Sequence, residues 1–386
     1  MNLDKFKENI CKTGFELEFR ISETLRNNGW TVINNKYYID DYEDKVREID
    51  LIAYKASKVQ DDFIIYTTLV ISCKKSEKNL WALLSKNLDV KDPNLELKPV
   101  HIWTNNKVLN FIISHENFKD KYYSYIETKN IKSAIKVPEF HIFAFQEMDI
   151  QEAKPKNDSA IYDSITSLMK AQSYEMNSLI ERNDKRPNTI YQFNLLSLID
   201  SKLIRIHFEE TNINASEIQE DNYIARYIIK KEQTFASIHF IQASAFKEKL
   251  NQYDNLHNEN CLFFREHYNL FYTDAAINNH KNILFFDVFY YKLKKIILGY
   301  FNNKNNSIYF ELHDLFFDKV THVLQVNKHD CSFSYNKNNI LEIYLHLPEH
   351  IFEKIQNNRK IKLETGKLLK NVYRYTGKFD FTDIPF

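Results

Sequence analysis

The chain has 386 residues, of which 44% are hydrophobic and 27% charged, the composition of a globular protein rather than a disordered one. Lysine and arginine number 52, as do aspartate and glutamate, so the net charge is zero. This balance excludes a chain that is basic throughout, although it allows a local basic groove. The five glycines are too dispersed for a GxGxxG or GxxxxGK loop, which excludes the common glycine-dependent phosphate sites.

Cysteine spacing and apolar runs bear on the compartment. The four cysteines lie far apart without a CxxC pair, so we expect reduced thiols rather than a disulfide framework. The opening "MNLDKFKENICK" lacks an apolar signal core, and the longest apolar run, residues 63–73, is too short to cross a bilayer. We therefore expect a cytoplasmic protein with no membrane partner.

The first 150 residues alternate between helical and strand patterns. Residues 3–28 are predicted to form one helix, because apolar residues recur every three or four positions and Gly29 suits its C-terminal cap. Strand-like runs rich in Val, Ile, Tyr and Thr follow at 30–39, 46–55 and 63–74. The segment "EKNLWALLSKNL" is predicted to be helical, and "VHIWT" and "EFHIFAFQ" are predicted strands. This order predicts a domain over residues 1–150 built on a mixed α/β sheet.

The remainder divides less sharply. The polar run 151–158 is a weak linker, and a periodic helix is predicted over 160–182. "IYQFNLLSLIDSKLIRIHF" predicts two strands around a turn at Asp200–Lys202, and "TFASIHFI" predicts another strand. These elements make a helix-plus-strand region over 151–245. An aromatic-rich, mostly helical domain is expected over 246–386, with strands near 308–311 and 340–346 and a helix over 348–358 that begins at Pro348.

Two of the predicted strands carry polar residues on one face. Side chains alternate along a strand, so Glu48 and Asp50 of "REIDLIAY" share a face, as do Ser72 and Lys74 of "LVISCKK". If the two strands pair, Asp50, Ser72 and Lys74 converge on one side of the sheet.

Glu18 differs from the other acids of the first helix, because it lies at the flank of the apolar stripe, one turn after Gly14. A carboxylate there is partly desolvated, which costs free energy unless it is paired or bound to a metal ion. Gly14 leaves room beside it for a backbone or a phosphate.

Two acids and a lysine suit phosphodiester hydrolysis. Mg²⁺ prefers carboxylate oxygens, retains several waters and can activate one of them beside a phosphate. A nearby lysine can position that water or neutralise developing negative charge.

The segments "TGFELE", "REIDLIAY" and "VISCKKS" resemble the PD-(D/E)XK nuclease superfamily, over roughly residues 10–90. The resemblance implies a restriction-endonuclease-like fold, a four-stranded mixed sheet flanked by helices, which the strands to about 145 would complete. It also implies a Mg²⁺- or Mn²⁺-dependent nuclease. Glu18 would be the helix glutamate, Asp50 the first metal-binding acid, and Ser72-Cys73-Lys74 the (D/E)XK element.

This chain departs from the family pattern at Ser72, where a second acid is usual. In one interpretation Asp50, Glu18 and the Cys73 backbone carbonyl hold the metal ion, and Ser72 holds a metal-bound water. In another, Glu48 supplies the missing charge. In a third, the site is degenerate and binds nucleic acid without cutting it. A simpler alternative gives these residues no function: Asp50 and Lys74 form a surface ion pair, and Glu18 is a helix-surface charge.

Weaker candidates lie further along the chain. Gln172 falls on the apolar stripe of the second predicted helix, where a structural hydrogen bond is the simpler interpretation. His346 and His350 have a spacing that zinc could use, but Pro348 interrupts their helix. The basic tail over 359–378 could bind phosphates, or form a solvated helix face followed by a packed aromatic end.

The leading hypothesis is therefore a metal-dependent endonuclease acting on DNA or RNA, which the resemblance places in a prokaryotic restriction or antiphage system. The rest of the chain would recognise the substrate, a partner protein or a trigger. A double-strand cut would favour a homodimer, because one site cuts one strand. The competing hypothesis is a non-catalytic module on the same fold that binds nucleic acid or a protein.

Overall fold

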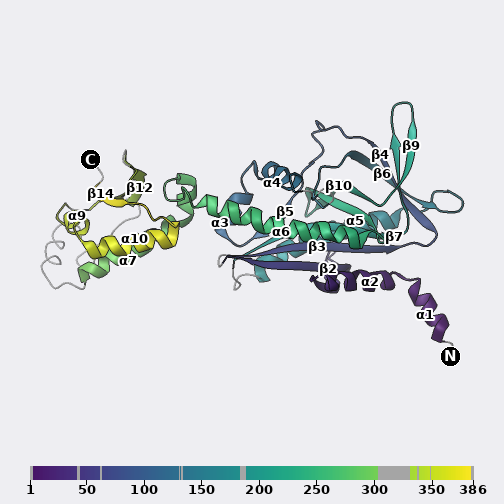
Figure 1. Cartoon of the computed structure of the whole chain (residues 1–386), viewed down its shortest axis with the longest axis horizontal. Coiled ribbons are helices and arrows are strands. Elements are labelled where there is room, and N and C mark those ends of the chain that lie inside the picture. The colour runs from purple at the N-terminus through teal and green to yellow at the C-terminus, as the bar shows by residue number, and fades with distance from the viewer. Residues whose placement is uncertain are drawn as a thin grey trace. The chain divides into compact units, whose positions relative to one another are not determined.

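The computed structural model describes residues 3–40, 44–60, 63–129, 131, 134–182, 188–302, 331–336, 339–347 and 349–383 (Figure 1). The chain divides into two compact units, Met1–Arg265 and Glu266–Phe386. This division differs from the boundaries at 150 and 245 expected from the sequence. The reason is that strands from both sides of residue 150 pair within the same sheets of the N-terminal unit.

The main sheet of the N-terminal unit contains seven of the described strands. These are β1 (Thr31–Ile39), β2 (Val46–Val59), β3 (Phe63–Lys75), β5 (His101–Thr104), β7 (Thr189–Asp200), β10 (Glu220–Ile229) and β11 (Glu232–Gln242). Strands β1, β2 and β3 form an antiparallel meander, and β7 lies parallel to β3. Strand β11 continues the sheet parallel to β7, and β10 closes it antiparallel to β11, while β5 pairs with the first half of β7. The neighbour of β3 is therefore β7, and not one of the strands before residue 145.

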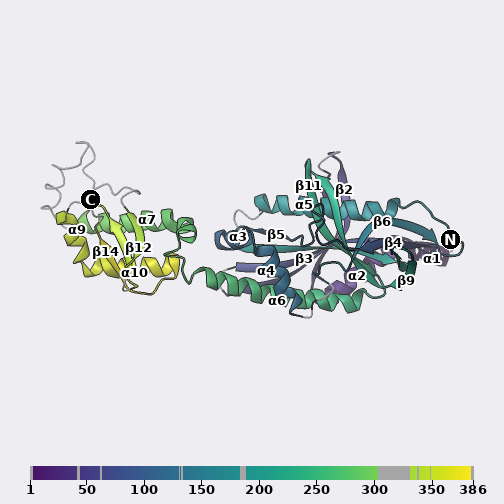
Figure 2. The same cartoon turned by 90° about the horizontal axis from the view of Figure 1, so that it is seen from above.

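Helices cover both faces of this sheet. They are α2 (Gly14–Asn27), α5 (Ser159–Arg182) and α6 (Phe246–Phe271). Helices α2 and α6 lie on one side of β2 and β3, and α5 lies on the other (Figures 1 and 2). Helix α5 confirms the predicted helix over 160–182. It contacts both edge strands, β1 and β10, so the sheet curls around it.

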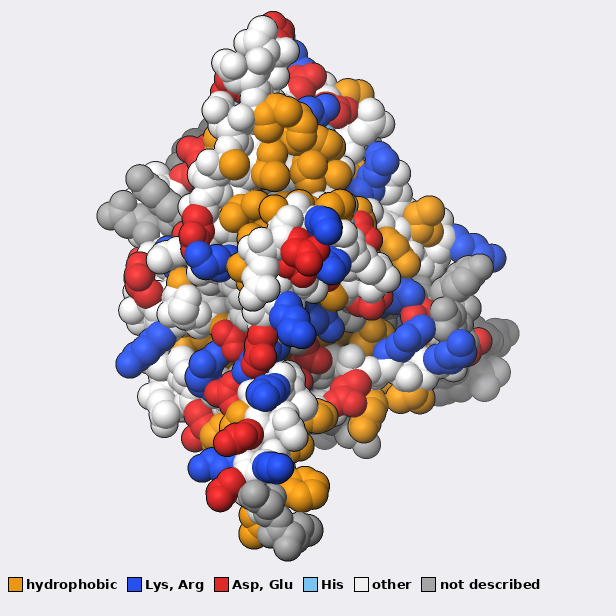
Figure 3. Space-filling model, turned by 90° about the vertical axis from the view of Figure 1, so that its right-hand side faces the viewer, with side chains coloured by type: hydrophobic (Ala, Val, Ile, Leu, Met, Phe, Trp, Pro, Cys, Tyr) orange, Lys and Arg blue, Asp and Glu red, His pale blue; other side chains and the backbone are white. Residues whose placement is uncertain are grey.

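A second, four-stranded sheet is ordered β6-β4-β8-β9. Its members are β4 (Asn79–Asn87), β6 (Phe140–Asp149), β8 (Leu203–Phe208) and β9 (Ile213–Ile218). The predicted helix over 77–88 is wrong, because β4 pairs with β6 on one side and β8 on the other, and alternate residues Trp81 and Leu83 enter the core. Hydrophobic side chains gather below the tip of the β8–β9 hairpin (Figure 3), and Phe143 and Ile213 of this sheet are exposed.

The predicted single helix over 3–28 is also wrong, because the chain breaks between α1 (Leu3–Cys11) and α2. Thr13 is extended, with φ −85° and ψ 166°, and acts as the residue before the first turn of α2. None of the described residues of α1 is buried, so packing against the core does not hold α1 in line with α2. Gly29 confirms its predicted role, because it follows α2 in the left-handed region at φ +80°.

Two short helices, α3 (Lys107–Ile113) and α4 (Phe118–Glu127), complete the N-terminal unit. The described elements of the C-terminal unit are α7 (Asn279–Asn302), β12 (Cys331–Tyr335), β13 (Leu341–Leu345), α9 (Glu349–Gln356), α10 (Arg359–Tyr373) and β14 (Phe379–Thr382). They confirm the predicted strand over 340–346 and the helix that follows it. The predicted strand at 308–311 and Pro348 lie outside the described residues. Among the described helices, none combines the length and the hydrophobicity that crossing a bilayer requires.

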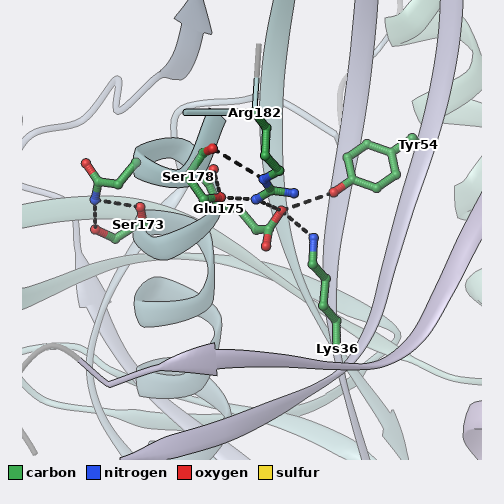
Figure 4. Close-up of polar contacts among 7 residues, drawn as sticks. Lys36, Tyr54, Ser173, Glu175, Ser178 and Arg182 are labelled. Carbon is green, nitrogen blue, oxygen red and sulfur yellow. Dashed lines mark hydrogen bonds and ion pairs between the residues drawn. The ribbon is translucent and has the colours of Figure 1, made fainter. Parts of the chain in front are cut away.

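The buried carboxylate of Glu175 on α5 forms hydrogen bonds with residues of the curled sheet (Figure 4). Glu175 is 2% exposed and accepts hydrogen bonds from Lys36 Nζ at 2.7 Å, Arg182 at 3.1 Å and the Tyr54 hydroxyl at 3.3 Å. Lys36 lies on β1 and Tyr54 on β2, so one side chain links the meander to α5. The negative charge near Tyr54 adds to burial in raising the pKa of that phenol above its ordinary value.

Replacing Glu175 should destabilise the N-terminal unit. Glu175→Ala leaves Lys36 without its ion-pair partner and Tyr54 without its acceptor, and we expect a loss of about 2–4 kcal/mol in the free energy of unfolding. Urea denaturation followed by circular dichroism measures it. Glu181→Ala on the same helix is the matched control, because Glu181 is exposed. Equal stability of the two variants would contradict the structural role of Glu175.

Candidate metal and phosphodiester site

The candidate site begins where β2 and β3 separate. Their antiparallel ladder runs from Val59–Phe63 to Leu51–Ile71 and ends there. Beyond that point the Cys73 N–H donates to Asp50 Oδ2 at 2.5 Å instead of to a backbone carbonyl. The N–H and C=O of one strand residue point to the same edge, so the Cys73 carbonyl, a predicted metal ligand, is also directed toward β2.

A second irregularity faces this point from β1. The ladder between β1 and β2 pairs Asn34 with Leu51 and Lys36 with Ile49, and between these pairs Asn35 adopts a left-handed backbone at φ +51°. The Asn35 side-chain amide donates a hydrogen bond to the Glu48 carboxylate. Sequence reasoning missed Asn35. The available signal was an Asn-Asn pair inside an otherwise strand-like run, because asparagine tolerates the left-handed region better than most residues.

Glu18 enters the site from α2, half-buried, with Gly14 one turn before it. A Cβ atom at Gly14 would lie 3.7 Å from Glu18 Oε1, an ordinary van der Waals contact, so the space beside the carboxylate does not depend on the glycine. Burial is the main cause that raises the pKa of Glu18 to about 7, and the charges of Asp50 and Glu48 raise it further. The Lys74 charge and a hydrogen bond from Asn35 act in the opposite direction.

Burial also affects Asp50, which accepts a hydrogen bond from the Ser72 side chain. Burial raises the pKa of Asp50, and the charge of Glu48 acts in the same direction. The Cys73 N–H, the charge of Lys74 and a hydrogen bond from the Ser72 side chain oppose that increase. Ser72 is 1% exposed, and its buried hydroxyl stabilises the ionised form of Asp50.

Lys74 supplies the positive charge of the site. It lowers the pKa of both Glu18 and Asp50, yet it forms no hydrogen bond or ion pair with any residue that the structure describes. The neighbouring Lys75 instead forms ion pairs with Glu16 at 3.4 Å and Asp200 at 3.6 Å. The simple alternative of an Asp50–Lys74 surface ion pair is therefore not what the described residues form.

The predicted residues thus come together: helix α2 brings Glu18, β2 brings Glu48 and Asp50, and β3 brings Ser72 and Lys74. Within the described ranges, however, no three His, Cys, Asp or Glu side chains are placed so that they could hold a metal ion as they stand. The donor set nevertheless fits a hard cation, because Asp50 and Glu48 both raise the pKa of Glu18 and a bound cation would relieve that repulsion. The arrangement is a cluster of acidic side chains that would have to move closer together to coordinate a cation.

The weaker candidates lie elsewhere. Gln172 is 3% exposed on α5 and donates to the Met176 sulfur at 2.9 Å, on the face of the sheet opposite to α2. His346 and His350 belong to no metal-binding group among the described residues. In the basic tail, the Arg374 guanidinium lies 4.4 Å from the centre of the Tyr272 ring, as a packed aromatic end would require.

No protein-family model matches the chain, and neither curated proteins nor solved structures give a match. The geometry around Glu18, Asp50 and Lys74 is therefore the basis for a functional proposal.

The raised pKa of Glu18 predicts a pH-dependent stability. Between pH 4.5 and about 7 the folded protein keeps a proton on Glu18 that the unfolded chain has lost, so stability falls as pH rises through this window. Glu18→Gln removes this effect, and we expect its melting temperature to exceed that of the wild type by a few degrees at pH 8 but not at pH 4.5.

Differential scanning fluorimetry at the two pH values measures the shift. Glu8→Gln is the control, because Glu8 is an exposed acid on the adjacent α1. A melting-temperature difference between Glu18→Gln and wild type that does not change with pH would contradict the electrostatic coupling.

Proposed function

We propose that the N-terminal unit is a divalent-metal-dependent nuclease that hydrolyses phosphodiester bonds of DNA or RNA. The observation that carries the proposal is the convergence of Glu18, Asp50 and Lys74 from three separate elements at the point where β2 and β3 separate. Two partly buried acids and a lysine that forms no ion pair with a described residue suit the binding of a cation and a phosphate together.

The order of elements supports the restriction-endonuclease-like fold. Helix α2 precedes the antiparallel β1-β2-β3 meander, and helix α5 crosses over to β7, which lies parallel to β3. The resemblance of "REIDLIAY" and "VISCKKS" implies a four-stranded mixed sheet flanked by helices, and β1, β2, β3 and β7 with α2 and α5 fit that description. Asp50 lies on β2 and Ser72-Cys73-Lys74 lies on β3, and these two strands are neighbours in the sheet.

Each residue has a role in this proposal. Asp50 and Glu18 would hold Mg²⁺ or Mn²⁺, and Glu48, which is exposed and bonded to Asn35, is positioned to add the charge that Ser72 lacks. The bound cation would polarise the scissile phosphate and lower the pKa of a coordinated water. Lys74 would contact a phosphate oxygen and offset the negative charge that develops there. The Cys73 N–H fixes the Asp50 carboxylate in its orientation.

The direct test is cleavage of plasmid DNA and of a single-stranded RNA in Mg²⁺ or Mn²⁺. We expect Lys74→Ala to lower the cleavage rate about 100-fold or more, because one preorganised charge at a developing anion has roughly that effect. Asp50→Asn should have at least as large an effect, since it removes a metal ligand.

Lys78→Ala is the control for Lys74→Ala, because Lys78 is exposed just beyond the end of β3. Cleavage by the wild type that persists undiminished in Lys74→Ala and Asp50→Asn would place the active site elsewhere. Equal inactivity of all forms on both substrates would favour the second candidate function.

That second candidate is a non-cutting module on the same fold that binds nucleic acid or a partner protein. It is favoured by one observation: Ser72 is a neutral, buried residue bonded to Asp50, where a second acid would complete a metal site. In either case the role of the C-terminal unit in recognising a partner or trigger stays a proposal, as does dimer formation for a double-strand cut.

Restoring an acid at this position separates the two candidates. Ser72→Glu should lower the melting temperature in EDTA, because it buries another carboxylate beside Asp50, and Mn²⁺ should recover the loss by binding the folded form. Calorimetry should show tighter Mn²⁺ binding than in the wild type. Ser216→Glu, on exposed β9, is the control. Absence of Mn²⁺ binding in both wild type and Ser72→Glu would count against a metal site.

A further inference from the structure

Exposed aromatic rings without a packing partner lie on the elements that carry or border the candidate site. Elsewhere in the described chain the exposed rings contact a second ring or a lysine, and they are Phe143, Tyr162, Tyr291 and Tyr335. The exposed rings that form no such contact with a described residue are Phe6, Phe15, Phe19 and Tyr37. They belong to α1, α2 and β1. A scattered exposed ring is ordinary, whereas a group of them beside polar site residues marks a contact surface.

Helix α2 presents two of these rings beside Glu18. Leu17 and Ile21 are 0% and 2% exposed and face the sheet, where α2 packs on β3, β1 and β2 (Figure 1). Phe15 and Phe19, 65% and 66% exposed, lie one turn apart and point away from the sheet. Residues three apart on a helix are surface neighbours, so Phe15 lies next to Glu18 on the outer side of α2.

A third ring borders the site from β1. Tyr37 is 62% exposed and pairs with Glu48 in the antiparallel ladder of β1 and β2. Side chains directly opposite one another in such a ladder share a face, with Cβ atoms about 4.5–5.5 Å apart. The carboxylate of Glu48 accepts a hydrogen bond from Asn35, also on β1. The acids of the site are therefore flanked by aromatic rings from α2 and from β1.

Lys75 holds the start of α2 against β3. Its ammonium donates to the Cys11 carbonyl at 2.8 Å and lies 3.4 Å from the Glu16 carboxylate. Glu16 belongs to the first turn of α2, and Lys75 directly follows Lys74 on β3. The turn that carries Phe15 is thus fastened to the strand that carries the lysine of the candidate site.

We propose that Phe15, Phe19 and Tyr37 form a stacking platform for unpaired bases, so that the candidate site takes a single-stranded nucleic acid. The inference rests on the proposed function: a protein partner packed on Phe15 would cover Glu18, whereas a nucleotide strand brings its own phosphate to that site. Aromatic faces stack on bases of any sequence, and duplex bases are already stacked on their neighbours. Lys74, which forms no ion pair with a described residue, supplies a positive charge for the backbone of that strand.

The test measures binding without cutting. In EDTA, we expect the wild type to bind a fluorescent 12-nucleotide single strand about tenfold or more tightly than the corresponding duplex. Phe15→Leu combined with Phe19→Leu removes two exposed rings, so the melting temperature should not change, but affinity for the single strand should fall about tenfold. A 2-aminopurine base in the strand should lose emission on binding the wild type and keep it with the double variant. Tyr37→Leu should weaken binding severalfold.

The matched control is Tyr291→Leu, which removes a ring that is 58% exposed on α7 in the C-terminal unit. Wild-type affinity in the Phe15→Leu/Phe19→Leu variant, an equal loss in the control, or equal affinity of the wild type for single strand and duplex would overturn the platform. Sedimentation tests a protein occupant. A wild-type dimer that becomes monomeric in the double variant, with unchanged strand affinity, would assign the rings to contact between copies and overturn the proposal.

These outcomes are distinct from those of the nuclease test, because binding is measured without a metal ion. Weak strand binding by the Phe15→Leu/Phe19→Leu variant, together with a wild type that cleaves neither DNA nor RNA, would reject the nuclease and keep the platform. Cleavage that depends on Lys74, with unchanged strand binding by the double variant, would do the reverse.

Discussion

The hydrogen bond from the Cys73 N–H to the Asp50 carboxylate is the contact on which the candidate site depends. Where two antiparallel strands separate, each buried backbone N–H that leaves the ladder needs another acceptor. Here the acceptor is the side chain of Asp50 on β2, the strand from which β3 separates. The separation of the two strands and the position of Asp50 therefore depend on the same hydrogen bond. The bond also favours the ionised carboxylate against the burial that raises its pKa.

The remaining residues of the site raise or lower the pKa of Asp50, which is partly buried. Ser72 and Lys74 both stabilise the charged form of Asp50. The negative charges of Glu48 and Glu18 repel that of Asp50. A fourth carboxylate in place of Ser72 would add to this repulsion in the metal-free protein. The neutral serine therefore avoids a further carboxylate charge beside Asp50.

Sequence patterns indicated that Glu18, Asp50 and Lys74 lie near one another, because strand alternation and helical periodicity can be read locally. Alternation along β2 and β3 placed Asp50 and Lys74 near one another, and the flank position of Glu18 on its helix marked it as half-buried. The patterns failed where tertiary pairing decides. Trp81 and Leu83 lie in a strand because β4 pairs with β6 on one side and β8 on the other. The chain breaks before Gly14 because no described residue of α1 is buried against the core. Asn35 was missed because its left-handed backbone has no signature in hydrophobic periodicity.

The curvature of the sheet places both of its edge strands, β1 and β10, against helix α5. A flat sheet would hold β1 and β10 at opposite ends, separated by β2, β3, β7 and β11. Because the sheet wraps around α5, Lys170 of that helix contacts Asp40 beyond β1 and Tyr227 on β10 together. Glu175, less than two turns further along α5, holds β1 and β2 in the same wrap through Lys36 and Tyr54. The charged side chains Lys170 and Glu175 of α5 thus link this helix to β1, β2 and β10 and to the residue that follows β1.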